Sequence, residues 1–184
     1  MSRIPELPIE SLSPEQRKVH DAIVAGPRGA IQGPLNIWLR SPKMAERAQE
    51  LGAFCRYQTS LPKRLSELAI LITGASWKAG FEWFVHAPIG IAAGLDSDAV
   101  EAIRTGADPE FARTDEAALY EFTRELLEKR RVSDATYERA VTELGTLGVV
   151  ELVGIVGYYA LISMTIVAFK VPLPQGEPEP FPER

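Results

Sequence analysis

Apolar residues recur along this chain at the three- and four-residue spacing of helices, and no segment shows the apolar and polar alternation of a half-buried strand. Ser, Thr, Asp or Pro stands where most of these periodic segments begin, as expected of helix starts. The pattern predicts helices over about residues 14–24, 42–57, 62–76, 81–93, 97–105, 114–130, 133–144 and 149–170. We therefore expect an all-α fold with one domain over residues 12–172.

Two segments lack this periodicity. Residues 25–34, with the sequence AGPRGAIQGP, are punctuated by Gly and Pro and are predicted to form a loop. Residues 173–184 are rich in Pro and Glu, and we expect this tail to be extended or disordered. Within the predicted helix over residues 81–93, Pro88 cannot donate a backbone hydrogen bond, which predicts a bend just after His86.

The segment LVGIVGYYALISMTIVAF at residues 152–169 carries no charge and approaches the length of a membrane-spanning helix. Glu151 at its head, the hydroxyl side chains within it and the absence of a second such segment favour a different interpretation. We expect a core helix that is buried on all sides, partly at a subunit interface, in a protein that does not enter a membrane.

Charge and composition narrow the classes of function. The formal charge of −5 and the sequence pI near 5.2 argue against a nucleic-acid partner, because such binding depends on clustered Lys and Arg. The first ten residues carry acids and prolines rather than a basic and then apolar signal, so we expect a cytoplasmic location. The single cysteine, Cys55, excludes a disulfide framework and a thiolate-held zinc ion, and the only histidines are His20 and His86.

Candidate chemistry lies between residues 67 and 86. Glu82 and His86 are four residues apart on one predicted helix, so that their side chains share a face. Glu67 lies on the preceding predicted helix, and the short connection at residues 77–80 makes the two helices neighbours. A carboxylate can orient an imidazole and raise its pKa, which gives a general acid/base pair at neutral pH. The alternative is an ordinary surface helix, on which Glu67 would pair with Lys63.

Neighbouring side chains are candidates for substrate binding. Trp77, Trp83 and Lys78 come first, and Phe81 and Phe84 could complete an apolar wall, with core packing as the alternative role for the aromatic residues. Three further candidates for anion binding, each with a solvated surface charge as the alternative, are Arg40, Arg56 and Arg64. Two carboxylates with one imidazole could also hold a divalent metal ion.

The sequence resembles the carboxymuconolactone decarboxylase family, in the branch that also contains the alkylhydroperoxidase D-like proteins. The matching segments are GPLNIWLRSP at residues 33–42, the block over residues 61–103 with its Glu, FEWFVHA and AAGL elements, and ELVGIVGYYALISMTIVAFKVPLP at residues 151–174. The resemblance implies an all-helical fold that assembles as trimers or hexamers, with pockets near the subunit contacts. It calls for no cofactor and no metal.

One motif of the family's peroxidase branch is missing here. In that branch a glutamate is followed by a CxxC motif and a histidine, which together activate a thiolate. The resemblance places the glutamate at Glu67 and the histidine at His86, whereas the two cysteine positions hold Ala79 and Glu82. Cys55 lies on an earlier predicted helix and has no second cysteine, so we expect it to serve in packing.

Three functions remain in view. The resemblance and the missing thiols favour a cofactor-independent lyase acting on a small carboxylated or lactone metabolite. In that enzyme His86 would donate the proton, and Glu82 or Glu67 would orient it or take part in the relay. The second function, a thiol peroxidase, is disfavoured because the CxxC pair is absent. The third is a non-catalytic helical oligomer that binds a small ligand or a partner.

Overall fold

The computed structural model describes residues 2–181, which form helices joined by short connections, with no strand in that range. The expectation of an all-α fold is therefore confirmed. After a short 3-10 turn, η1 (Ile9–Ser11), the elements are α1 (Pro14–Ala25), α2 (Pro34–Trp38), α3 (Pro42–Tyr57), α4 (Lys63–Trp77), α5 (Gly80–Ala92), α6 (Ser97–Thr105), α7 (Thr114–Lys129) and α8 (Asp134–Phe169).

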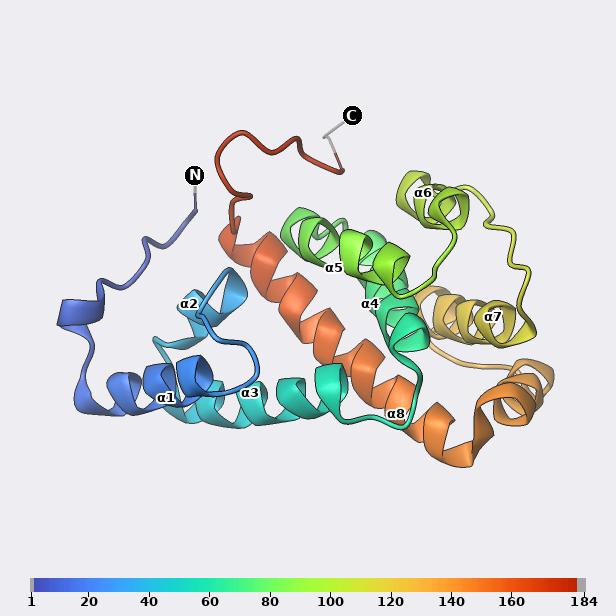
Figure 1. The fold of residues 1–184 in the computed structure, drawn as a ribbon, viewed down its shortest axis with the longest axis horizontal. Coiled ribbons are helices and arrows are strands. Elements are labelled where there is room, and N and C mark those ends of the chain that lie inside the picture. The colour runs from blue at the N-terminus through green and yellow to red at the C-terminus, as the bar shows by residue number, and fades with distance from the viewer. Residues whose placement is uncertain (1, 182–184) are drawn as a thin grey trace.

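The longest helix, α8, runs diagonally across the molecule and organises the others (Figure 1). Helices α1, α2 and α3 lie toward one end, and α7 lies with the first turns of α8 at the other. Helix α4 packs on α5, α7 and α8. Its residues from Leu65 to Gly74 are all buried, so the helix that the sequence shows to be apolar on nearly all sides is the centre of the fold.

Side-chain caps explain where some helices begin. The Ser13 side chain accepts a hydrogen bond from the backbone N–H of Gln16, and Ser133 makes the same kind of bond at the start of α8. Ser41, which precedes α3 in the same way, makes no such bond. Pro42, whose fixed φ suits the first helical position, starts that helix instead.

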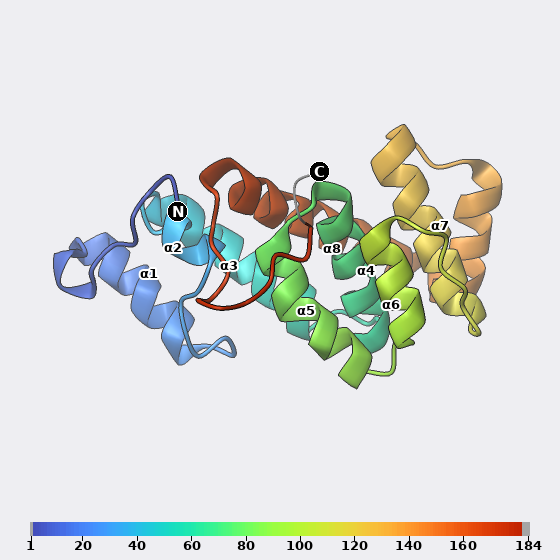
Figure 2. The same ribbon diagram turned by 90° about the horizontal axis from the view of Figure 1, so that it is seen from above.

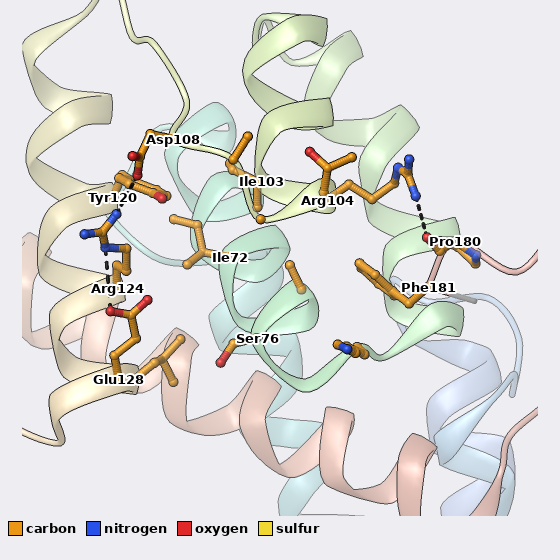
Figure 3. Close-up of a pocket in the computed structure, with 16 residues that line it drawn as sticks. Ile72, Ser76, Ile103, Arg104, Asp108, Tyr120, Arg124, Glu128, Pro180 and Phe181 are labelled. Atoms are coloured by element: carbon orange, nitrogen blue, oxygen red, sulfur yellow. Dashed lines mark hydrogen bonds and ion pairs between the residues drawn. The ribbon is translucent and has the colours of Figure 1, made fainter. Parts of the chain in front are cut away.

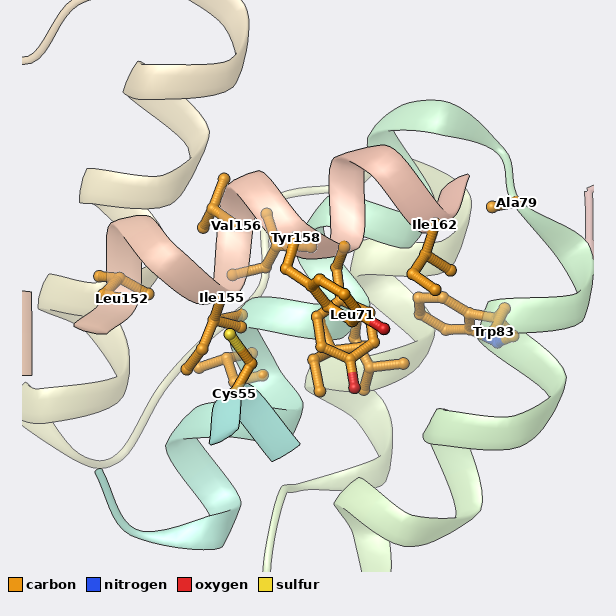
Figure 4. Close-up of a cluster of buried hydrophobic side chains, with 14 of the residues drawn as sticks. Cys55, Leu71, Ala79, Trp83, Leu152, Ile155, Val156, Tyr158 and Ile162 are labelled. Carbon is orange, nitrogen blue, oxygen red and sulfur yellow. The ribbon is translucent and has the colours of Figure 1, made fainter. Parts of the chain in front are cut away.

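Gly145 interrupts α8. Its φ of 71° and ψ of 162° are not helical, so the element consists of two helices over residues 134–144 and 146–169. The two predicted helices are thus present, separated by one residue rather than the expected four. The second of them carries Leu152, Ile155 and Ile162 into the buried core between α3, α4 and α5 (Figure 4).

The connection between α1 and α2, residues 26–33, is irregular as predicted. Gly33 at its end has a φ of 54°, and a Cβ atom there would collide with the Phe81 ring. Only glycine therefore lets this loop lie directly against α5. The short helix α2 that follows was not predicted, because five residues are too few to show a helical period.

The tail has neither helix nor strand, but it packs on the helices (Figure 2). The Phe181 ring lies edge-on to Trp83 on α5, with ring centroids 5.4 Å apart. The carbonyl oxygen of Pro180 accepts a hydrogen bond of 2.6 Å from Arg104 on α6 (Figure 3). Ordered packing thus continues beyond residue 172 to residue 181. Residues 182–184 of the predicted tail lie outside the described residues.

Of the described helices, α8 is long and apolar enough to span a membrane by length and composition. Half of its most apolar 18-residue window is buried inside the protein, as in a core helix. The other side leaves apolar side chains exposed, namely Leu147, Val150, Val153, Met164 and Val167. The helix is thus buried on one side rather than on all sides, which corrects that part of the sequence-based expectation.

Candidate functional site

The turn between α4 and α5 brings the candidate chemistry together. Lys78 ends α4 in the left-handed conformation, with a φ of 52°, and the chain then turns back along α4. Near the turn the Glu82 side chain lies against Gly74. Farther from the turn, Glu67 lies opposite His86. The expectation that the two helices are neighbours is confirmed.

His86 lies between two carboxylates. Its Nδ1 atom is 2.6 Å from Oε2 of Glu67, and its Nε2 atom is 2.9 Å from Oε1 of Glu82. All three residues are buried, with exposed fractions of 2%, 2% and 5% for Glu67, His86 and Glu82. Buried charges are costly unless they pair, and these three groups pair with one another. The structure therefore joins the three predicted catalytic residues in one cluster.

The carboxylates determine the charge of the imidazole. Burial by itself lowers the pKa of His86, because it disfavours the charged form. The charges and hydrogen bonds of Glu82 and Glu67 act in the opposite direction, and together they raise the pKa above its ordinary value of 6.5. His86 consequently retains a proton at pH values where a solvated imidazole has lost it.

Two tyrosines of α8 pack on this cluster. The Tyr159 ring meets the His86 ring edge-on with centroids 5.3 Å apart, and Tyr158 meets Tyr159 at the same distance. Burial raises the pKa of Tyr158 to about 12 and raises the pKa of Tyr159 well above its ordinary value. Both phenols therefore stay neutral near pH 7 and can form hydrogen bonds without acting as bases.

A small cavity opens beside His86 and Glu82. Its volume is about 80 Å³, and its walls come from the 26–33 loop, α2, α3, α5 and α8. The polar residues that line it are Arg28, Gln32, Arg56, Glu82, His86, Tyr158 and Tyr159. Two arginines and an acid/base pair therefore share one small space.

Most of the predicted substrate-binding residues lie elsewhere. Trp77 is 39% exposed at the end of α4. Lys78 lines a separate groove of about 570 Å³ over α4, α6 and α7, which Figure 3 shows. Trp83 is buried against Phe181 and does not line the cavity. Phe81 is the aromatic candidate that does line the cavity.

Of the three arginines predicted to bind anions, two make contacts away from the cavity. Arg64 binds Asp115 at 2.6 Å and also binds Glu116, so it joins α4 to α7. Arg40 donates a hydrogen bond of 2.7 Å to a backbone carbonyl near the N-terminus. Arg56 is the predicted anion-binding residue that lies at the cavity.

The single thiol lies in the core. Cys55 is 1% exposed and packs near Ile155 and Tyr158 (Figure 4). Burial raises the pKa of its thiol to about 11, so almost none of it is thiolate near pH 7. Ala79, which occupies one of the family's cysteine positions, is buried at the start of α5.

Within residues 2–181 no group of three or more His, Cys, Asp or Glu side chains is arranged to hold a metal ion. The geometry of the cluster explains why it does not form such a group. Glu67 and Glu82 occupy opposite nitrogens of the His86 ring, so the three side chains do not converge on one point.

Sequence reasoning missed several residues of the cavity, among them Arg28, Tyr158 and Tyr159. The tyrosines had a usable signal, because they place hydroxyl groups within an otherwise apolar helix and a buried phenol usually needs a partner. Arg28 had none, since its position depends on the path of a Gly- and Pro-rich loop.

No family model matches this chain, and no curated protein matches it. Solved structures do match it. One is the alkylhydroperoxidase AhpD core of an uncharacterised peroxidase-related protein from Ralstonia eutropha JMP134, with 13% identity, a TM-score of 0.74, and coverage of 95% of this chain and 93% of the other. An uncharacterised peroxidase-related protein from Silicibacter sp. TM1040 matches with 12% identity and a TM-score of 0.72, over 91% and 90% of the two chains.

A third match is a protein of unknown function from Agrobacterium tumefaciens, whose name associates it with the antioxidant defence protein AhpD. It has 14% identity and a TM-score of 0.66, over 78% of this chain and 99% of the other. Identities this low establish a shared fold and leave the activity open. The chain therefore has the helical fold of the alkylhydroperoxidase AhpD-like proteins.

Proposed function

We propose that this protein is a cofactor-independent acid/base enzyme, a decarboxylase-like lyase that acts on a small carboxylated or lactone metabolite. The observation that carries the proposal is the buried His86, which is held between Glu67 and Glu82 at the wall of a cavity. An imidazole that carboxylates orient and keep protonated is suited to donate a proton near neutral pH. The substrate class comes from the resemblance to the carboxymuconolactone decarboxylase family.

The proposed reaction assigns one role to each residue of the cluster. The bond to the leaving carboxylate breaks, CO₂ departs, and the electron pair stays on carbon, where an adjacent carbonyl group of the substrate delocalises it. His86 then supplies the proton of the new C–H bond, either directly or through Glu82, since both line the cavity. Glu67 does not line the cavity, so it is a positioning residue that holds Nδ1 of the ring.

The size of the cavity favours a substrate with few carbon atoms. Its volume of about 80 Å³ is far below the roughly 300–1,000 Å³ of pockets for drug-sized ligands. The 26–33 loop forms part of the wall. A larger lactone acid would therefore enter only if this loop moved outward.

A thiol peroxidase is the alternative, and the peroxidase-related names of the structural neighbours are the observation in its favour. Thiol peroxidases need an accessible thiolate. Cys55 is instead buried with a pKa of about 11, and the chain holds no second cysteine. We therefore favour the lyase over the peroxidase, because the chain lacks the accessible thiolate that a thiol peroxidase requires.

The test is a proton-transfer assay with small β-keto acids and lactone acids, beginning with acetoacetate, oxaloacetate and carboxymuconolactone. The readouts are CO₂ release and incorporation of solvent deuterium at the carbon beside the carbonyl group. We expect the wild type to turn over at least one of them. His86→Gln should reduce the rate by about 10²–10⁴-fold, the usual contribution of a general acid.

The control is His20→Gln, which replaces the only other histidine, on α1, and should leave the rate unchanged. A folded His86→Gln variant with full activity would overturn the assignment of the acid. A wild type that binds small carboxylates but neither releases CO₂ nor exchanges deuterium would overturn the lyase and support the non-catalytic, ligand-binding function.

We further propose that a second copy of the chain covers the exposed side of α8, within the trimer or hexamer that the family resemblance implies. One face of this helix carries apolar or small residues at three- and four-residue steps: Leu147, Val150, Gly154, Gly157, Leu161 and Met164. The space over Gly154 and Gly157 is open, which suits the close approach of another helix. The opposite face of α8 is already packed in the core, which argues against lipid around the whole helix.

Light scattering during size-exclusion chromatography tests this assembly. We expect the wild type to have the mass of a trimer or hexamer. Val150→Glu, at a position that is 65% exposed, should lower the mass, whereas Val24→Glu on α1 should not. A monomeric wild type would contradict the proposal.

A further inference from the structure

The two arginines at the cavity, Arg28 and Arg56, differ from the arginines that form ion pairs within the fold. Arg64, Arg104, Arg124 and Arg139 all bind carboxylates of this chain. Within residues 2–181, no carboxylate oxygen lies within 4.0 Å of the guanidinium nitrogens of Arg28 or Arg56. The positive charges of these two half-buried side chains are therefore not neutralised by an ion pair with the described residues.

Arg28 is held in place from one side only. Its Nη2 atom donates a hydrogen bond of 3.3 Å to the hydroxyl oxygen of Tyr158. Its Nε atom is buried and has no hydrogen-bond partner among the described residues. A buried donor without a partner is energetically unfavourable, because it has lost its hydrogen bond to water without gaining another. A ligand that accepts this hydrogen bond would remove that cost.

Helix α3 leaves room for this arrangement at Gly52. A Cβ atom at that position would collide with the hydroxyl oxygen of Tyr158 and would lie 2.5 Å from Nη2 of Arg28. The absence of a side chain at Gly52 thus lets the loop, α3 and α8 meet at the guanidinium group. The position of Arg28 is set by three separate elements of the fold.

We infer that Arg28 and Arg56 form a carboxylate-binding subsite of the cavity, so that the substrate is a small dicarboxylic acid. The Nε and Nη groups of an arginine match the two oxygens of a carboxylate. Across the same cavity lie Glu82 and His86, which would meet the remainder of the substrate. The inference rests on the proposed function, because it assumes that His86 is the proton donor and places a substrate carboxylate across the cavity from it.

The second carboxyl group follows from the energetics of the reaction. A carboxylate paired with arginine is stabilised as an anion, which opposes its loss as neutral CO₂. The carboxylate at Arg28 therefore remains on the product, and a different carboxyl group leaves. A monocarboxylic acid lacks one of these two groups and a neutral peroxide lacks both, so the subsite selects against them.

Malonate is a suitable probe, because it is a three-carbon dicarboxylate without the ketone or lactone carbonyl group that the proposed reaction needs to delocalise the electron pair. Its binding is measured by calorimetry and by the NMR signal of the Arg28 Nε–H group, with uncharged malonamide as the matched control ligand. We expect malonate to shift that signal and malonamide to leave it unchanged. Arg28→Gln and Arg56→Gln should each weaken malonate binding by about 10- to 100-fold, as expected for a lost charge-assisted hydrogen bond.

Two further variants keep the test decisive. Arg28→Lys retains the positive charge but not the two parallel N–H donors of the guanidinium group. It should therefore bind malonate more weakly than the wild type and more tightly than Arg28→Gln. Arg47→Gln, at a side chain that is 75% exposed on α3, should bind like the wild type. Equal malonate affinity in the wild type and in both glutamine variants would overturn the subsite, as would a wild type that does not bind malonate.

The subsite and the proposed reaction fail separately. If malonate binding depends on Arg28 but the wild type turns over no substrate, the lyase is wrong and the subsite stands. If substrates turn over with His86 dependence and without Arg28 dependence, the lyase stands and the subsite is wrong.

Discussion

Oε2 of Glu67 lies 2.6 Å from Nδ1 of His86, although 19 residues separate them in the chain. The pair joins α4 to α5 inside the core and fixes the orientation of the imidazole ring. It leaves Nε2 directed toward Glu82, which lies at the cavity. A histidine of ordinary reactivity thereby becomes a positioned and protonated acid beside a small ligand site.

The raised pKa of His86 makes the stability of the protein depend on pH. Since the native pKa lies above 6.5, the native state binds a proton that the unfolded state has released. The resulting stabilisation is fully present below pH 6.5 and is lost as pH rises through the native pKa. Between the two pKa values the free energy of unfolding should fall by up to about 1.4 kcal/mol per pH unit.

Denaturant titrations between pH 6 and pH 8.5 measure this dependence. The His86→Gln variant should lose it, whereas His20→Gln should retain it. The same slope in His86→Gln as in the wild type would show that another group causes the dependence.

Cys55 should react as a buried thiol. Because it is 1% exposed and has a pKa of about 11, a disulfide reagent should modify it at neutral pH only as fast as the protein opens or unfolds. The measurement compares modification of the native protein with modification in denaturant. Immediate labelling of the native protein, or peroxide-dependent dithiol oxidation that Cys55→Ser abolishes, would support the peroxidase instead.

Arg64 is expected to stabilise the fold without contributing to ligand binding. Its side chain is 10% exposed and binds both Asp115 and Glu116. Arg64→Gln therefore leaves Glu116 without this ion pair and leaves Asp115 with only the Nε atom of Arg113, 3.5 Å away. We expect a loss of about 1.5–3 kcal/mol in the free energy of unfolding. Lys18→Gln, which breaks an exposed pair with Glu46, should cost much less, because water screens the charges of exposed pairs.

Malonate binding should be the same in Arg64→Gln as in the wild type, measured where both are folded. A selective loss of malonate affinity in Arg64→Gln would show that Arg64 does contribute to anion binding.

The C-terminal tail should contribute to stability through Phe181. Removing the ring in Phe181→Ala deletes its edge-on contact with Trp83 and should cost about 1–2 kcal/mol, somewhat more than an aromatic pair alone. Phe181→Leu, which keeps apolar contact but not the aromatic pair, should cost less. Thermal unfolding gives the comparison, and equal stability of Phe181→Ala and the wild type would show that the tail does not stabilise α5.

The candidate site was predictable where local rules apply. The spacing of Glu82 and His86 on one helix, and the short connection that returns the chain past Glu67, are sufficient to assemble the acid/base cluster. The tail had no such rule, because Pro- and Glu-rich composition gives no sign of the contact between Phe181 and Trp83. No local rule predicted the positions of Trp77 and Lys78 either. Both residues lie at the end of α4, where the turn directs them away from the acid/base cluster.

Arg28 shows the limit of sequence reasoning most clearly. It enters the cavity because the 26–33 loop lies against α5 at Gly33 and because α3 has no side chain at Gly52. Both contacts join elements that are far apart in the chain. The sequence around each glycine does not predict which element will pack against it. Periodicity and spacing along the chain contain no information about such contacts.

The most direct test of the central claim is an NMR titration of the His86 imidazole in the wild type, in Glu67→Gln and in Glu82→Gln, with the His20 signal as an internal control. We predict a pKa above 6.5 in the wild type and a lower pKa in each variant, because burial remains while one of the opposing carboxylates is lost. The His20 signal, beside Asp21 on α1, should be the same in all three proteins. A His86 pKa at or below 6.5 in the wild type, or one that neither substitution changes, would contradict the account.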